Sequence, residues 1–268
     1  MSRVKPDLCL ISFAIIGSTL VILIVLALLN ITASQLSDIP FLLEVASDSR
    51  VVDSILLTFF AGLNAVIILV LLGAPLAYVL ARTQSRFNNI IESIIDIPLI
   101  LPHTVAGIMI YLLFMQRGLI GGPLNNVGIL FEDAYPGIVV AMLFVAMPFY
   151  VDTAREGFQK VPVHMENVAR TLGATRFKAF SLVVFPLSIR HIINGCILAW
   201  GRAVSEFAAV IMIAYYPLIV STLIYYRFTT GGIKESTAIA FLMVLASFSV
   251  FILLRLVTRY VVRYDDRV

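Results

Sequence analysis

Charged residues are scarce in this sequence. Only 13% of its 268 residues are charged and 60% are hydrophobic, whereas a typical soluble domain has about 25% charged and about 45–50% apolar residues. A soluble globule of this size would need polar side chains over the surface that stays exposed after folding. The composition therefore excludes a soluble fold, a disordered chain and a nucleic-acid-binding protein. It indicates a protein whose surface faces lipid.

Cysteine and histidine are scarce as well. The two cysteines, Cys9 and Cys196, lie in apolar runs, so they predict neither a disulfide framework nor a zinc cluster. The three histidines are scattered, with no acidic or thiol cluster beside them. The sequence also contains no G-x-x-x-x-G-K-[ST] phosphate-binding loop. We therefore expect neither an enzyme nor a cofactor or metal site in this chain.

Long apolar runs are abundant. A helix needs about 20 mostly apolar residues to cross a bilayer, and strands of a membrane barrel alternate over about 10 residues. Six runs are long and continuous enough for helices, and they cover residues 8–31, 54–81, 90–115, 135–153, 187–214 and 237–261. The sequence predicts an all-α integral membrane protein with six transmembrane helices, in one transmembrane domain over residues 1–268.

Lysine and arginine are unevenly placed between these runs. If the N-terminus is inside, 14 of the 19 cations lie on the cytoplasmic side, including Arg3, Lys5 and Arg267. Only four lie in the outer connections, and Arg202 falls within the fifth run. Cytoplasmic loops carry the excess of lysine and arginine in membrane proteins. We therefore expect both termini in the cytoplasm of a multi-pass protein of the cell membrane.

The connection between the fourth and fifth runs, residues 155–186, carries the densest charge. Met165, Val168 and Leu172 recur there at helical spacing, and Pro162 suits the start of a helix. Gly173 is suited to end that helix. Such an amphipathic helix either lies in the lipid headgroups or docks onto a cytosolic partner.

Further features of this connection concern charge and the next turn. Glu166 and Arg170 are four residues apart, on a face of the expected helix different from the apolar one. A second short helix is expected to begin near Thr175, before the chain re-enters the membrane at Pro186.

The run ENVARTLGATRFKAFSLVVFP, residues 166–186, resembles the EAA loop of permease subunits of bacterial and archaeal ABC importers. The matching positions are Ala169, Gly173, Val183, Phe185 and Pro186. Asn167 and Val168 replace the first two residues of the EAA triplet, and the acidic residue, Glu166, stands one position early. We call residues 155–186 the EAA-like loop. The resemblance implies an ABC importer permease fold.

In that family the loop forms coupling helices that sit in a cleft of an ATP-hydrolysing subunit. The resemblance implies that the coupling residues here are Glu166, Asn167, Ala169, Arg170, Leu172, Gly173, Ala174 and Arg176. It also implies that ATP and Mg²⁺ are bound by two copies of a separate cytoplasmic ATPase subunit.

Two further segments narrow the group. DIPLILPHTVAG (residues 96–107) and GRAVSEFAAV (201–210) are similar to the molybdate, tungstate and sulfate branch of these permeases. AYYPLIVSTLIYYR (214–227) most resembles the archaeal molybdate/tungstate type. The resemblance implies a homodimer that imports molybdate or tungstate, delivered by an extracellular or periplasmic binding protein. A sulfate permease of the same family is the alternative.

Ionisable residues inside a bilayer usually face the bundle interior or a wet cavity. Arg202 and Glu206 are one helical turn apart in the fifth run. They either neutralise each other or border a translocation pathway, with Ser205 as a hydroxyl donor. The resemblance places the third and fifth spans along that pathway.

The third run is interrupted by Pro98 and Pro102, which break the helical hydrogen-bond ladder. We expect Pro102, His103 and Thr104 to help form a gate, with Gly107 allowing a close helix approach. A proline kink buried between helices is the alternative.

A stand-alone secondary anion transporter or channel, with Arg202 as its anion site, is the rival class. It predicts inverted repeats with matching broken helices. The sequence has no such symmetry, because the proline-broken third run has no counterpart in the sixth.

Overall fold

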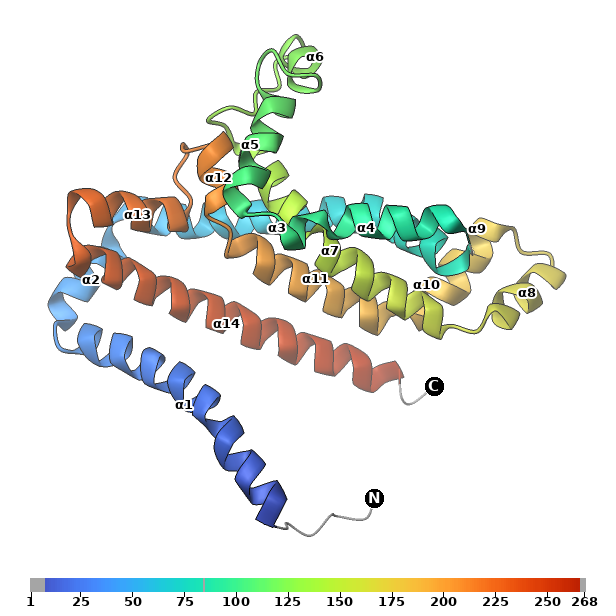
Figure 1. Ribbon diagram of the computed structural model, residues 1–268, viewed down its shortest axis with the longest axis horizontal. Helices are drawn as coiled ribbons and strands as arrows, with labels where there is room; N and C mark the ends of the chain where they lie inside the picture. The colour runs from blue at the N-terminus through green and yellow to red at the C-terminus, as the bar shows by residue number, and fades with distance from the viewer. Residues whose placement is uncertain (1–7, 84, 266–268) are drawn as a thin grey trace.

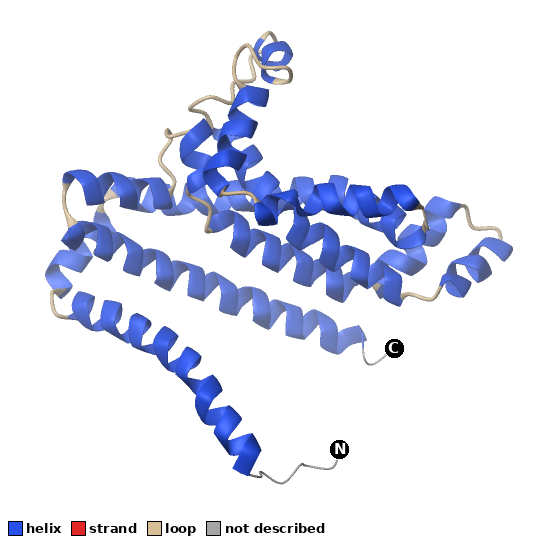
Figure 2. Cartoon of the chain, viewed as in Figure 1, coloured by secondary structure: helices blue, strands red, loops and turns tan. Residues whose placement is uncertain are grey.

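The computed structural model describes residues 8–83 and 85–265. In these residues the chain forms helices, turns and loops (Figure 2). Arg3, Lys5 and Arg267, which contribute to the expected orientation, lie outside the described residues. The elements in chain order are α1 (Leu8–Leu36), α2 (Ile39–Ser47), α3 (Ser49–Arg82), α4 (Arg86–Ile100), α5 (His103–Phe114), α6 (Gly121–Asn125), α7 (Tyr135–Lys160), α8 (Val163–Thr171), α9 (Arg176–Ala179), the π-helix η1 (Phe180–Val184), α10 (Phe185–Leu187), α11 (Ile189–Val204), α12 (Ala208–Ile213), α13 (Val220–Thr230) and α14 (Ile233–Asp265).

Four helices are each long and apolar enough to cross a membrane: α1, α3, α7 and α14. They coincide with the first, second, fourth and sixth predicted runs and extend beyond them at one or both ends. Two further pairs of helices meet the same criterion only if each bent pair counts as one span. The described residues therefore hold four to six candidate spans, and six is the number expected from the sequence.

The third run, 90–115, is divided between α4 and α5, and the helix direction bends by 115° between them. Leu101 between them has extended backbone (φ −72°, ψ 139°), the conformation favoured by a residue that precedes a proline. Pro102 is the N-cap residue of α5. The predicted break is confirmed at Pro102, where the chain turns sharply. The break expected at Pro98 is wrong, because Pro98 lies inside α4, which continues to Ile100.

The fifth run, 187–214, requires a correction because it is not one helix. α11 ends at Val204 and α12 begins at Ala208. Between them, Glu206 Oε1 accepts a hydrogen bond of 2.7 Å from the N–H of Ala209. This side chain thus satisfies an amide in the first turn of α12, which favours a new helix start over continuation of α11.

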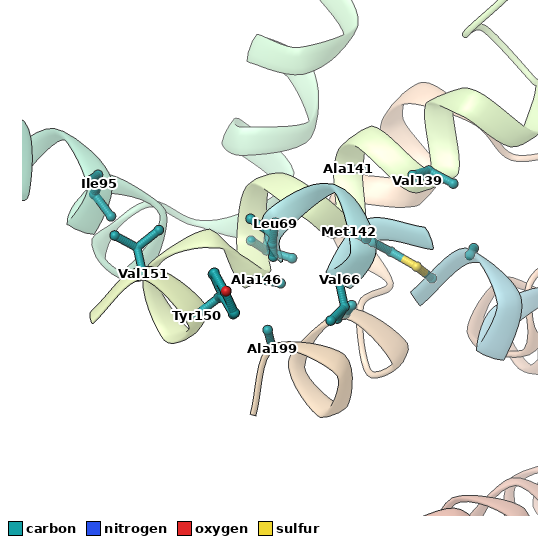
Figure 3. Packing of buried hydrophobic residues seen from close by; sticks show 14 of the residues in the cluster. Val66, Leu69, Ile95, Val139, Ala141, Met142, Ala146, Tyr150, Val151 and Ala199 are labelled. Atoms are coloured by element: carbon teal, nitrogen blue, oxygen red, sulfur yellow. The ribbon is translucent and has the colours of Figure 1, made fainter. Parts of the chain in front are cut away.

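The core lies where α7 packs between α3 and α11 (Figure 1). Figure 3 shows central contacts of this core, made by Val66, Leu69, Met142, Ala146 and Ala199. Small residues bring the helices close together: a Cβ added to Gly73 of α3 would lie 3.0 Å from the ring of Tyr150 on α7. Such close approach provides the van der Waals packing that holds helices together in lipid.

Helix α1 lies mostly apart from this bundle. It diverges from α14 toward its N-terminal end (Figure 1) and makes its contacts with α2 and α14. Gln35, near its other end, donates a hydrogen bond of 3.3 Å to Thr237 Oγ1 of α14. None of the most apolar 18-residue window of α1 is buried. Its apolar side chains therefore face lipid or another protein chain.

Helices α5 and α12 project from the side of the bundle, and α6 lies beyond the far end of α5 (Figure 1). The two helices are in close contact: a Cβ added to Gly107 of α5 would lie 2.7 Å from the carbonyl oxygen of Ala209 on α12. The predicted close helix approach at Gly107 is confirmed.

Candidate functional sites

The EAA-like loop stands at the end of the bundle where α3 and α7 end (Figure 1). Pro162 is the N-cap residue of α8. Gly173 follows the helix at φ +94°, and its N–H donates to the carbonyl of Arg170 at 3.0 Å. Thr175 then caps α9, because its hydroxyl accepts the N–H of Lys178 at 3.2 Å. The predicted helix, glycine stop and second helix are confirmed.

One face of α8 presents apolar side chains to the outside. Met165 and Val168 are exposed, and Leu172 is 84% exposed. Phe177 on α9 adds an aromatic ring that is 76% exposed. Arg170 and Arg176 are exposed as well. Contiguous exposed apolar residues rimmed by charge are typical of an interaction surface.

The opposite face of α8 is turned toward the bundle. Glu166 is only 8% exposed, and Tyr78 Oη donates to its Oε2 at 2.7 Å. Its Oε1 pairs with Arg82 Nε. The sequence pattern placed Glu166 beside Arg170 in the same helix, whereas its carboxylate pairs with Arg82 of α3. The remaining coupling residues are Asn167, which is exposed, and Ala169 and Ala174, which are partly exposed.

Tyr78 and Arg82 are not among the site residues predicted from the sequence. A tyrosine one helical turn before an arginine at the end of an apolar run is a weak signal, because nothing local identifies Glu166 as their partner.

A second polar cluster lies at the junction of α5, α11 and α12. Arg202 Nη2 donates to Glu206 Oε2 at 2.6 Å, and His103 Nδ1 lies 3.3 Å from the same oxygen. Arg202 Nη1 also donates to Ser205 Oγ at 3.2 Å. Glu206 is only 2% exposed. The fold therefore brings together four of the residues that the sequence predicted for the pathway.

The other predicted pathway residues lie close by along the chain. Pro98 is buried in α4, Pro102 precedes α5, and Thr104 is exposed in the first turn of α5. A groove of about 760 Å³ is lined by Arg202 and Ser205, together with Ser221 and mostly apolar residues of α11, α13 and α14.

The electrostatics of this cluster favour mutual neutralisation. Arg202 and Glu206 carry opposite charges in direct contact, and Glu206 also accepts the N–H of Ala209. A guanidinium that is already paired with a carboxylate is a weak site for a further anion. His103, which lies 2.9 Å from Arg202 Nη2, and Ser205 are the more accessible members of the cluster.

Comparison with known proteins places the chain in a family. The profile of the family described as "Binding-protein-dependent transport system inner membrane component" matches residues 73–263. The chain belongs to this family. It is a multi-pass membrane protein and a permease of the ABC transporter class.

Two relatives share its full extent. This permease is 39% identical over 251 residues to the molybdate/tungstate transport system permease protein WtpB of Pyrococcus furiosus, covering 94% of this chain and 96% of that one. It is 36% identical over 251 residues to the protein of the same name from Thermococcus kodakarensis, with the same coverage. The predicted resemblance to the molybdate/tungstate permeases is confirmed.

The fold of the permease also matches a solved structure. A chain of a bacterial alginate ABC transporter, crystallised in complex with an alginate-pentasaccharide-bound periplasmic protein, superposes with a TM-score of 0.72. The match covers 95% of this permease and 94% of that chain at 14% sequence identity. The predicted ABC importer permease fold is confirmed.

Proposed function

We propose that this permease is the translocating subunit of an ATP-driven importer for molybdate and tungstate. The single observation that carries the proposal is the exposed apolar face of α8, formed by Met165, Val168 and Leu172 at the end of the bundle. The names of the two full-length relatives support the substrate.

The partner at α8 is an ATPase. The permease sequence contains no phosphate-binding loop, so the energy of transport comes from a separate subunit that binds ATP and Mg²⁺. Two copies of that subunit dock on the EAA-like loops of two permease chains. The permease itself carries out no chemistry.

A second copy of the permease completes the pathway. The bundle of one chain is filled by its own side chains around α7, and none of the most apolar 18-residue window of α1 is buried. Helices α5 and α12 also project from the bundle (Figure 1). A homodimer covers such surfaces and places a pathway between the two chains.

The cation distribution supports the orientation of the permease. The EAA-like loop and both termini face the cytoplasm, and α2 and α13 face outward. An extracellular or periplasmic binding protein delivers the oxyanion at the outer end. Tight binding belongs to that protein, because a pathway must release what it admits.

The pathway runs beside the cluster at the α5–α11–α12 junction. The residues that border it are Pro98, Pro102, His103, Thr104, Arg202, Ser205 and Glu206. Closure of the ATPase dimer moves α8, and the two arrangements of the permease open the pathway inward or outward in turn. This is a shift between two states driven by differential contact.

Two alternatives remain distinguishable. Sulfate, molybdate and tungstate are similar tetrahedral dianions, so isothermal titration of the binding protein with all three tests the substrate. Tight binding of sulfate alone would contradict the proposal.

A stand-alone transporter would carry the anion without ATP, so uptake into vesicles that lack ATP separates that class from an importer.

Co-purification tests the partner directly. The permease is co-expressed with candidate ATPase subunits and purified in detergent. We expect Gly173→Glu to abolish ATPase binding and uptake, because it adds charge at the turn that ends α8. Gly128→Glu is the matched control, since Gly128 also has a positive φ (+86°) with no atom within 4 Å of an added Cβ. Retained transport by Gly173→Glu would overturn the proposal.

A further inference from the structure

The acidic residue of the EAA-like loop faces the bundle. Successive residues of an α-helix are turned by about 100° about its axis, so a shift by one position changes the face that a side chain occupies. Glu166 is buried, whereas its neighbour Asn167 is exposed. Asn167 stands at the position that corresponds to the first residue of the EAA triplet. The exposed side of α8 therefore presents no carboxylate from Glu166.

Glu166 is held by two residues of α3. Tyr78 Oη donates to Oε2 at 2.7 Å, and Arg82 Nε pairs with Oε1. Arg82 Nη2 also donates to the carbonyl of Val161 at 3.0 Å, just before α8 begins. Charge-assisted hydrogen bonds of this kind are about twice as strong as neutral ones. We call Tyr78, Arg82 and Glu166 the latch.

The latch continues into an aromatic cluster. The ring of Tyr78 lies 4.7 Å from the ring of Phe180 in η1 and 5.8 Å from that of Phe158 in α7, centroid to centroid. Phe180 in turn contacts Phe185 at 5.9 Å. Tyr78 thus joins α8 to α3 through its hydroxyl, and its ring contacts α7 and η1, the helices before and after α8 and α9.

These contacts give α8 a fixed place on α3. α8 has nine residues, which is too short for a helix that is stable alone, and its apolar face is exposed. Without the latch, a displacement of α8 would be taken up by deformation of the loop that links α8 to the bundle. With it, a displacement of α8 displaces the end of α3, a helix of 34 residues that packs along the core.

We propose that Glu166 is a positioning residue for energy coupling: it binds α8 to α3, so that movement imposed by the ATPase reaches the membrane helices. This inference rests on the proposed function, because it requires an ATPase at α8. Glu166 acts through Tyr78 and Arg82, and its contribution lies in the transmission of movement after docking.

The test measures the number of anions taken up per ATP hydrolysed by the permease–ATPase complex in vesicles, with the binding protein and molybdate present. We expect Glu166→Gln to lower this ratio by about tenfold, within the range of measured coupling free energies. Co-purification of the ATPase should be unchanged. Tyr78→Phe, which removes one hydrogen bond and no charge, should lower the ratio less. Glu44→Gln, an exposed acid on α2 and outside the EAA-like loop, is the matched control and should leave the ratio unchanged.

The ratio separates coupling from mere loss of structure. A variant that only reduces the amount of folded complex lowers uptake and hydrolysis together and leaves the ratio constant. An unchanged ratio in Glu166→Gln would therefore overturn the inference, as would loss of ATPase binding by an otherwise folded Glu166→Gln. If this variant does not assemble, the double variant Arg82→Glu with Glu166→Arg, which exchanges the two charges, provides the test. A normal ratio of anions to ATP in the double variant supports the latch. An assembled double variant with a lowered ratio refutes it. If the unaltered permease binds no ATPase, the proposed function itself fails.

Discussion

Thr58 of α3 accepts a hydrogen bond of 2.9 Å from the N–H of Val220, which lies 162 residues further along the chain. Val220 is the first residue of α13, so this amide has no partner within its own helix. Thr58 is fully buried, and its hydroxyl also donates to the carbonyl of Ser54 at 2.6 Å. One hydroxyl thus fixes the start of α13 against α3.

Replacing Thr58 by valine should destabilise the permease. The shape of the side chain is nearly kept, but the N–H of Val220 loses its acceptor, and an unsatisfied buried amide costs about 1–3 kcal/mol. The midpoint of thermal unfolding in detergent measures the effect. Thr229→Val, whose hydroxyl bonds only within its own exposed helix, should change the midpoint much less. Equal midpoints for the two variants would contradict this account.

Gly107→Ala should separate α5 from α12. The added Cβ would lie 2.7 Å from the Ala209 carbonyl oxygen and 2.8 Å from its Cα, so backbone must move. Overpacking of this kind costs about 1–3 kcal/mol. Gly201→Ala meets no atom within 4 Å and should be neutral or stabilising by up to about 1 kcal/mol. Chemical unfolding of both variants provides the comparison, and a fully stable Gly107→Ala would show that the contact is loose.

The effects of Arg202 and Glu206 on the stability of the permease should depend on each other. Removing one partner of a buried ion pair leaves an uncompensated charge and costs about 3–5 kcal/mol. We therefore expect Arg202→Met to be strongly destabilising, and the double variant with Glu206→Gln to recover most of the loss. The coupling energy from a double-mutant cycle checks this. Additive effects of the two substitutions would mean that the two charges do not depend on each other.

His103→Ala should slow vectorial uptake of molybdate while the complex with the ATPase still assembles. His103 is the more exposed partner of the buried Glu206, at 3.3 Å, and it is one of the residues proposed to border the pathway. His103→Asn retains a polar side chain and should be less impaired. Unchanged uptake kinetics in His103→Ala would remove this residue from the gate.

The sequence predicted features whose cause is local. Apolar length located the long helices, and Gly173 ended α8 because a residue at φ +94° favours glycine. The break after Val204 was missed, since Arg202 and Glu206 are spaced as in a continuous helix. The new helix start is stabilised by the N–H of Ala209, which donates to the Glu206 carboxylate three residues earlier in the chain.

The partner of Glu166 was unpredictable for a different reason, because a tertiary contact selects it. Within α8, a helical pattern offers Arg170 as its neighbour, and the choice of Arg82 instead depends on how α8 is folded back onto α3. The 115° turn between α4 and α5 is a further case. A proline predicts an interruption of a helix, while the direction taken afterwards depends on what the next helix packs against.

The interruption at Pro102 has a consequence for hydration. The first amides of α5 have no side-chain cap and no partner inside the helix. In a bilayer, non-helical backbone is tolerated only where protein or water reaches it. The break before α12 lies beside the start of α5, since His103 is 3.3 Å from Glu206. Water should therefore penetrate to this depth even in the absence of substrate. The amides of His103, Thr104 and Val105 should then exchange with deuterium far faster than those of α7.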